Sequence, residues 1–160
     1  MKRQGFLNKL KAEGKLELVE TSEEICRSYL KKADDCLKSA RILLQNDLCE
    51  NSVSMSYYTM YNSLTALLFK VGIKCENHAG SIIIFRKLFG GPDLHKTIFS
   101  AKKERVDKQY YVDLALTRDS AQDLLKKAEG FLLEMKLMIK SVSNKDVERV
   151  RSKFNRLFME

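Results

Sequence analysis

The sequence predicts an all-α protein: a bundle of four to five helices in one domain, followed by an additional C-terminal helix. Two observations lead to this prediction. The 160 residues include a single proline, Pro92, and seven glycines, so few positions force a helix to end. Apolar residues recur at intervals of three and four along most of the chain, which is the period of one helical face. At this length, one domain buries a sufficient core without disulfides or a structural metal.

The first expected helix follows an N-terminal arm, residues 1–22, which mixes lysine, glutamate and glycine with a few apolar residues. Thr21 or Ser22 can cap this helix, because two acidic residues follow and favour a first helical turn. Asn46 and Asp47 then end it. Its apolar face consists of Ile25, Tyr29, Ala33, Cys36, Leu37, Ala40, Leu43 and Leu44.

The second expected helix combines an apolar face with a row of small residues, over Val53 to Phe69 and on to a stop at Gly72. It contains three tyrosines, and each phenol hydroxyl needs a partner when it is buried. The small residues allow a neighbouring helix to approach closely. The apolar face holds Val53, Tyr57, Met60, Tyr61, Leu64, Leu67, Leu68 and Val71, and the small residues are Ser52, Ser54, Ser56, Ser63 and Ala66.

Three further helices complete the expected bundle, which spans residues 23–140. A shorter helix runs from His78 to Phe89. The sequence Gly90-Gly91-Pro92 then breaks the chain, and a helix resumes near this proline, which suits a first helical turn. A last long helix runs from about Thr117 to Ile139.

Residues 141–160 are expected to form a separate basic and amphipathic helix, capped by Ser143 or Asn144. Such a helix can dock back on the bundle, contact a partner protein, or touch nucleic acid or a membrane surface. The pattern of residues leaves these alternatives open.

The overall charge favours an acidic partner. The net charge is +8 and the isoelectric point is near 9.3, as in proteins that contact nucleic acid or an acidic protein surface. The four cysteines form no C-x-x-C pair and metal-ligating histidine spacings are missing, so we expect no metal and no other cofactor. No apolar segment is long enough for a signal core or a membrane span, so we expect a cytoplasmic protein with reduced thiols and no membrane partner.

Four segments, in a fixed order, carry a resemblance to a known family. They are YLKKADDCLKSARILL (Tyr29 to Leu44), SYYTMYNSLTALLFKVG (Ser56 to Gly72), His78-Ala79-Gly80 leading to Phe85, and an arginine before a tyrosine in a charged segment that precedes SAQDLLKKAEGFLLEM (Ser120 to Met135). Their order and spacing resemble the HEPN superfamily, and most closely its small single-domain branch that accompanies minimal nucleotidyltransferases.

The resemblance implies an up-and-down helical bundle that forms a homodimer. Many HEPN domains are metal-independent endoribonucleases of toxin or defence systems, with an R-x(4–6)-H motif at the dimer cleft. In that motif the arginine neutralises the phosphate, and a histidine with a near-neutral pKa moves the proton of the attacking 2′-hydroxyl. Other HEPN domains bind nucleotides or are partners of a nucleotidyltransferase that modifies them.

The charged segment departs from this motif. Arg105 stands in the place of the arginine, but the positions where the histidine would stand hold Tyr110, Tyr111 and Val112. Tyrosine has an ordinary pKa near 10 and is therefore a poor general base at neutral pH. The missing histidine argues against enzyme activity without excluding it. If ribonuclease activity is retained, the expected catalytic residues are Arg105 with Tyr110 or Tyr111.

A binding site is the preferred interpretation of the same region. Arg105 can bind a phosphate, with Lys102 and Lys108 adding positive potential, and the alternative is a solvated charged face. Tyr58 and His78 complete the predicted ligand site, because a tyrosine of the second helix can line a cleft shared with the histidine and the arginine.

Three functions remain open from the sequence. The first is a non-catalytic module that binds a nucleotide, RNA or a nucleotidyltransferase partner in a toxin–antitoxin-like system. The second is a metal-independent endoribonuclease toxin. The third is a protein-interaction adaptor that acts through its C-terminal helix.

Overall fold

The computed structural model describes residues 2–110 and 117–159 of the chain. Within these ranges, the side chains of residues 107–110 are not described. None of the helices in these ranges is long and apolar enough to cross a membrane. The elements are α1 (Lys2–Ala12), β1 (Leu16–Leu18), α2 (Glu23–Gln45), α3 (Cys49–Lys70), β2 (Ile73–Cys75), α4 (His78–Phe89), α5 (Pro92–Tyr110), α6 (Arg118–Ser141) and α7 (Asn144–Arg156).

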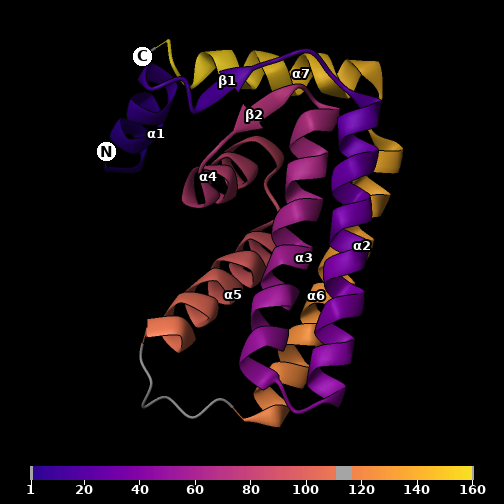
Figure 1. Ribbon diagram of the computed structural model, residues 1–160. Helices are drawn as coiled ribbons and strands as arrows, with labels where there is room; N and C mark the ends of the chain where they lie inside the picture. The colour runs from indigo at the N-terminus through magenta and orange to yellow at the C-terminus, as the bar shows by residue number, and fades with distance from the viewer. Residues whose placement is uncertain (1, 111–116, 160) are drawn as a thin grey trace.

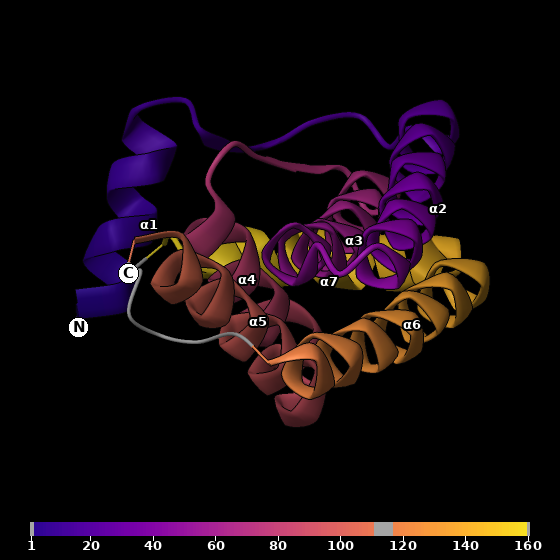
Figure 2. The same ribbon diagram turned by 60° about the horizontal axis from the view of Figure 1, so that its bottom comes forward.

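Helix α3 lies at the centre of the bundle, as its composition predicts. The long helices α2 and α6 pack along it, and α4 and α5 lie on the side of α3 away from α2 (Figures 1 and 2). All of the small residues except the half-buried Ser54 are buried, and the Ser52 hydroxyl donates a hydrogen bond of 2.8 Å to the Ala40 carbonyl of α2. The prediction of an all-α bundle is confirmed.

Side-chain caps fix the starts of four helices where the sequence predicts them. Ser22, Asn77, Thr117 and Ser143 each accept a backbone N–H from the first turn of α2, α4, α6 and α7, respectively. Each cap satisfies one of the N–H groups that a helix start leaves without an intrahelical partner. The breaks between elements therefore follow from local chemistry.

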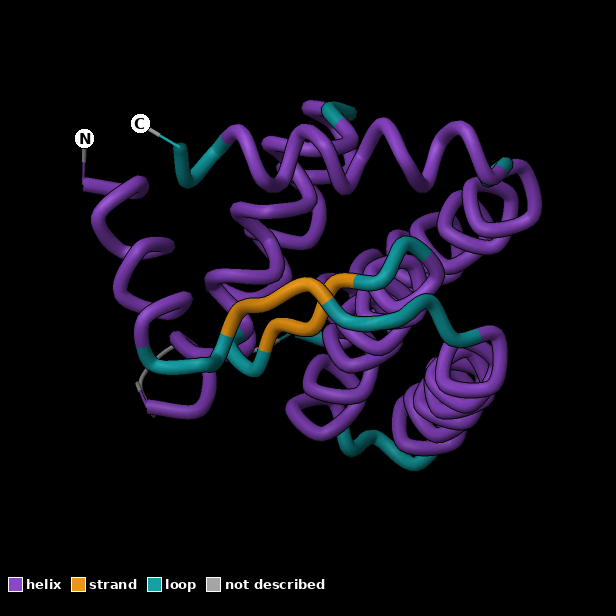
Figure 3. Tube along the Cα trace, turned by 90° about the horizontal axis from the view of Figure 1, so that it is seen from above, coloured by secondary structure: helices purple, strands orange, loops and turns teal. Residues whose placement is uncertain are grey.

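The region before Glu23, expected as an arm, packs on the bundle. Leu7 and Leu10 of α1 and Leu16 of β1 are buried. Strand β1 pairs with β2 in an antiparallel ribbon, with Leu16 opposite Cys75 (Figure 3). These strands have no signal in the sequence, because three residues are too few to show the alternation of a strand.

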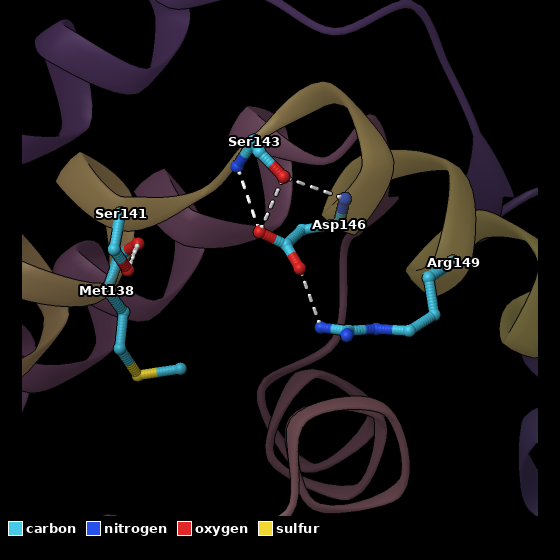
Figure 4. Close-up of polar contacts among 5 residues, drawn as sticks. All are labelled: Met138, Ser141, Ser143, Asp146 and Arg149. Carbon is cyan, nitrogen blue, oxygen red and sulfur yellow. Dashed lines mark hydrogen bonds and ion pairs between the residues drawn. The ribbon is translucent and has the colours of Figure 1, made fainter.

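Helix α7 crosses one end of the bundle, and α1 lies beside the C-terminal end of the chain (Figure 1). The apolar face of α7 is buried at Val150 and Phe154. A reciprocal capping box starts the helix: the Ser143 N–H donates to the Asp146 carboxylate at 3.0 Å, and the Asp146 N–H donates to the Ser143 hydroxyl at 3.2 Å (Figure 4). The Ser143 N–H and the Ser143 hydroxyl, the latter at 2.8 Å, both donate to the Asp146 carboxylate and lower its pKa.

Arg151 ties α7 to two other segments. Its Nη1 donates to the carbonyls of Val19 at 2.7 Å, Gly72 at 2.9 Å and Val71 at 3.3 Å. These carbonyls belong to the chain after β1 and to the end of α3. A Cβ at Gly72 would lie 2.1 Å from this nitrogen, so the glycine provides the space that the guanidinium occupies. One side chain thus joins the N-terminal region, the central helix and the C-terminal helix.

We predict that Arg151→Ala lowers the free energy of unfolding by about 2–3 kcal/mol, because three carbonyls lose a charged donor. Arg149→Ala is the matched control: this arginine pairs with Asp146 in the same helix, its side chain is 64% exposed, and its loss should cost at most about 0.5 kcal/mol. Urea unfolding of both variants measures the difference. Equal effects would show that Arg151 does not join these segments.

Candidate functional site

Four aromatic rings and one guanidinium gather where α3, α4 and α5 meet. They belong to Tyr57, Tyr58 and Tyr61 of α3, His78 of α4 and Arg105 of α5. We call this group the tyrosine–histidine–arginine cluster. It joins residues that are up to 48 positions apart in the sequence, the separation of Tyr57 and Arg105 (105 minus 57).

Local helix geometry places each member of the cluster. Tyr57 and Tyr61 lie one turn apart on α3 and face the same side. The Asn77 cap starts α4 so that its first residue, His78, comes next to these rings. On α5, Arg105 lies one turn after the buried Ala101, so it emerges from the face that packs on α3.

His78 is held on two sides by tyrosines. The hydroxyl oxygen of Tyr57 lies 2.8 Å from His78 Nδ1, and the imidazole stacks on the Tyr61 ring with 3.7 Å between ring centroids and 16° between planes. Burial raises the pKa of Tyr57, so its hydroxyl stays protonated at neutral pH. This hydroxyl can donate to Nδ1 of a neutral imidazole whose proton is on Nε2.

Burial and two nearby cations keep His78 neutral. Burial is the largest cause of its lowered pKa, and the positive charges of Arg105 and Lys102 lower that pKa further. A neutral imidazole can accept a proton, and it does not repel the cations beside it. The cluster therefore combines a neutral histidine with a guanidinium.

Arg105 lies over two tyrosine rings and is half-buried. Its Cζ is 4.9 Å from the ring centroid of Tyr58 and 5.5 Å from that of Tyr57, which is the distance range of a cation–π contact. Among the residues whose side chains are described, no carboxylate forms an ion pair with this guanidinium. Its hydrogen-bond donors are therefore suited to an anion such as a phosphate.

The structure brings together four of the predicted site residues. Arg105, Tyr58 and His78 are members of the cluster, and Lys102 lies close enough to lower the pKa of the histidine. The other three fall outside the description: nothing is described of the side chains of Lys108 and Tyr110, or of Tyr111. The roles assigned to them remain predictions.

Tyr57 and Tyr61 are part of the site although the sequence analysis did not include them among the ligand residues. Their spacing placed them on the apolar face of α3, which indicates core packing. Tyr57 is indeed fully buried, and it acts on the site through its hydrogen bond to His78. The available signal was the need of a buried hydroxyl for a partner, combined with a histidine at the next helix start.

The described residues offer no cluster of three or more histidine, cysteine, aspartate or glutamate side chains that could hold a metal. The cysteines Cys26, Cys36, Cys49 and Cys75 are free. Burial raises the pKa of Cys75, which lies beside the site, so its thiol is not activated as a nucleophile at neutral pH.

We predict that the free energy of unfolding falls as the pH drops from about 7 to 5, and that His78→Gln reduces this fall. Because the folded pKa of His78 lies below its ordinary value of 6.5, the unfolded chain takes up the proton first as the pH falls. Urea unfolding at several pH values measures the slope. His95→Gln is the comparison, because burial also lowers the pKa of His95, whereas the tyrosine hydrogen bond belongs to His78. A slope unchanged in the His78 variant would contradict the prediction.

Comparison with known proteins agrees with this architecture. A family model described as the HEPN domain matches residues 26–138, which include the whole cluster. A Thermotoga maritima protein named UPF0332 protein is 26% identical over 125 residues, covering 75% of this chain and 95% of that protein. A Methanocaldococcus jannaschii protein named "Putative toxin" is 27% identical over 124 residues, 75% of this chain and 92% of that protein. The chain belongs to the HEPN domain family.

Proposed function

We propose that this chain is a non-catalytic HEPN module that binds RNA or a nucleotide through the tyrosine–histidine–arginine cluster. The phosphate of the ligand pairs with the Arg105 guanidinium, and Lys102 adds positive potential beside it. The half-buried tyrosine Tyr58 lies next to the bound phosphate and offers a hydroxyl and an aromatic ring.

The observation that carries this proposal is the state of Arg105. The guanidinium is fixed over Tyr58 and Tyr57, is half-buried, and lacks an ion pair with any described carboxylate. A half-buried cation has lost part of its hydration, which costs free energy, and no described carboxylate compensates this cost. An anionic ligand would recover that cost. The cluster is therefore a better phosphate site than an ordinary solvated, charged surface.

The family relationships extend the proposal to partners. We propose that the chain acts in the cytoplasm as a homodimer and partners a minimal nucleotidyltransferase in a toxin–antitoxin-like system. The HEPN family assignment and the name of the Methanocaldococcus jannaschii relative support this context. The net charge of +8 also suits an RNA ligand or an acidic partner surface.

A metal-independent endoribonuclease is the second candidate, and one observation favours it. The fold places a neutral histidine, His78, beside Arg105, although the sequence offers no histidine at the usual spacing. The imidazole could accept the proton of a 2′-hydroxyl while the guanidinium neutralises the phosphate. In this form of the candidate, His78 takes the part that the sequence analysis gave to Tyr110 or Tyr111.

We predict that Arg105→Ala weakens the binding of RNA about 10- to 100-fold, because the phosphate loses a charge-assisted donor. The measurement is fluorescence anisotropy with a pool of structured and single-stranded RNAs in EDTA, with product analysis on gels. Arg27→Ala removes the same charge from the exposed surface of α2 and should change binding less than twofold. Circular dichroism confirms that each variant is folded.

Three outcomes separate the candidates. Binding without cleavage, weakened by Arg105→Ala, supports the non-catalytic module. Cleavage that disappears in Arg105→Ala and in His78→Gln would establish the ribonuclease and overturn the module. If wild-type protein neither binds nor cleaves RNA or nucleotides, both proposals are wrong, and a protein partner becomes the function to test.

A further inference from the structure

One face of α5 exposes an aromatic ring among cations. Phe99 is 52% exposed, and its ring stacks with that of His95 at 6.0 Å between centroids and 19° between planes. Lys102 lies one turn after Phe99, and Lys103 is exposed beside it. Arg86, at the end of α4, adds a positive charge that helps to lower the pKa of His95 after burial, its largest cause.

The two acids of α5 whose side chains are described, Asp93 and Glu104, lie on a different face. Asp93 and Glu104 both line a pocket of about 370 Å³ between α5 and α6, together with Lys96 and Lys127. Among the residues whose side chains are described, no carboxylate forms an ion pair with Arg86, Lys102 or Lys103. The face that carries Phe99 is therefore positive, and its charge is not neutralised by the described residues.

This face continues into the tyrosine–histidine–arginine cluster. Lys102 stands between the two, since it is one turn from Phe99 and also lowers the pKa of His78. From His95 to Arg105 the helix rises about 15 Å, at 1.5 Å per residue. Stacked nucleotides of one strand advance about 3.4 Å each, so this length fits about four nucleotides.

We propose that this face of α5, defined by Arg86, His95, Phe99, Lys102 and Lys103, binds a single-stranded polynucleotide whose phosphate enters the cluster at Arg105. Phe99 stacks on a base, which any base permits because each has a flat π-face. The cations pair with the phosphates of the neighbouring nucleotides. This inference rests on the proposed function and makes it more specific: the ligand is a strand of several nucleotides.

The Phe99 ring supplies the first test, made in the 160-residue chain. Anisotropy is measured with a fluorescein-labelled single-stranded ten-nucleotide RNA, its DNA equivalent and a blunt RNA duplex, and AMP binding is measured by calorimetry. Phe99→Ala should weaken single-strand binding about 5- to 100-fold and leave AMP binding unchanged, because one stacked base is lost. Phe99→Tyr should restore it. Leu133→Ala, which removes a 58% exposed side chain from α6, should have no effect.

The cations supply the second test. For a single strand, the slope of log K against log salt concentration changes by about 0.7 for each phosphate contact. Lys102→Ala and Lys103→Ala should each reduce the slope by about this amount, whereas Lys126→Ala on α6 should not change it. A preference for RNA over DNA, or equal binding of both, supports the inference, and the two results say whether the 2′-hydroxyl is recognised.

The contrary results are distinct. If Arg105→Ala weakens RNA binding and Phe99→Ala does not, the α5 face is not used and the proposed function stands. If neither variant changes RNA binding, the proposed function and the present inference are both wrong. If Phe99→Ala leaves RNA binding intact but changes the sedimentation coefficient of the protein, the ring covers a protein interface and the inference is overturned.

Discussion

The buried hydroxyl of Tyr57 needs a hydrogen-bond partner inside the protein, and the helices around it supply one. Helix α3 is covered by α2, α6, α4 and α5, so the Tyr57 ring has no access to water, and its hydroxyl must find a partner inside the protein. That partner is His78, the first residue of α4, at 2.8 Å. The hydrogen bond fixes the start of α4 against α3. The Tyr61 ring stacked on the imidazole and the Asn77 cap hold the same point from two other directions.

The same requirement explains why a cation can remain near the core. A protonated imidazole beside Arg105 would add an unfavourable repulsion, and burial prevents this by lowering the pKa of His78. The tyrosine faces, which carry negative partial charge, then provide the attraction that positions the guanidinium. None of the carboxylates whose side chains are described pairs with this guanidinium. A phosphate is the ligand that we propose for it, and the exposed cations of α5 extend the positive region along the same helix.

The sequence predicted the helices well because each signal is local. Spacing identified most of each apolar face, although Ile25 of α2 is exposed and Cys26 is buried beside it, and Ser22 and Ser143 were among the predicted caps. It also grouped Tyr58, His78 and Arg105, with the help of a family resemblance. It could not reveal that His78 bonds Tyr57, because that pairing depends on how α4 packs. The packing of α1 was missed for a similar reason. Leu10 contacts the position of Gly80, where a Cβ would lie 2.6 Å from its Cδ1, and only tertiary structure brings these residues together.

Titration of the His78 imidazole by nitrogen-15 NMR is the most direct test of whether the histidine and the Arg105 guanidinium share one site. If burial and the charge of Arg105 hold this ring neutral, its pKa lies below the ordinary value of 6.5 in the wild type and is higher in Arg105→Ala, with Nδ1 as the nitrogen without a proton. A pKa at or above 6.5 that does not respond to the loss of Arg105 would contradict this prediction, because the histidine and the guanidinium would not then share one site.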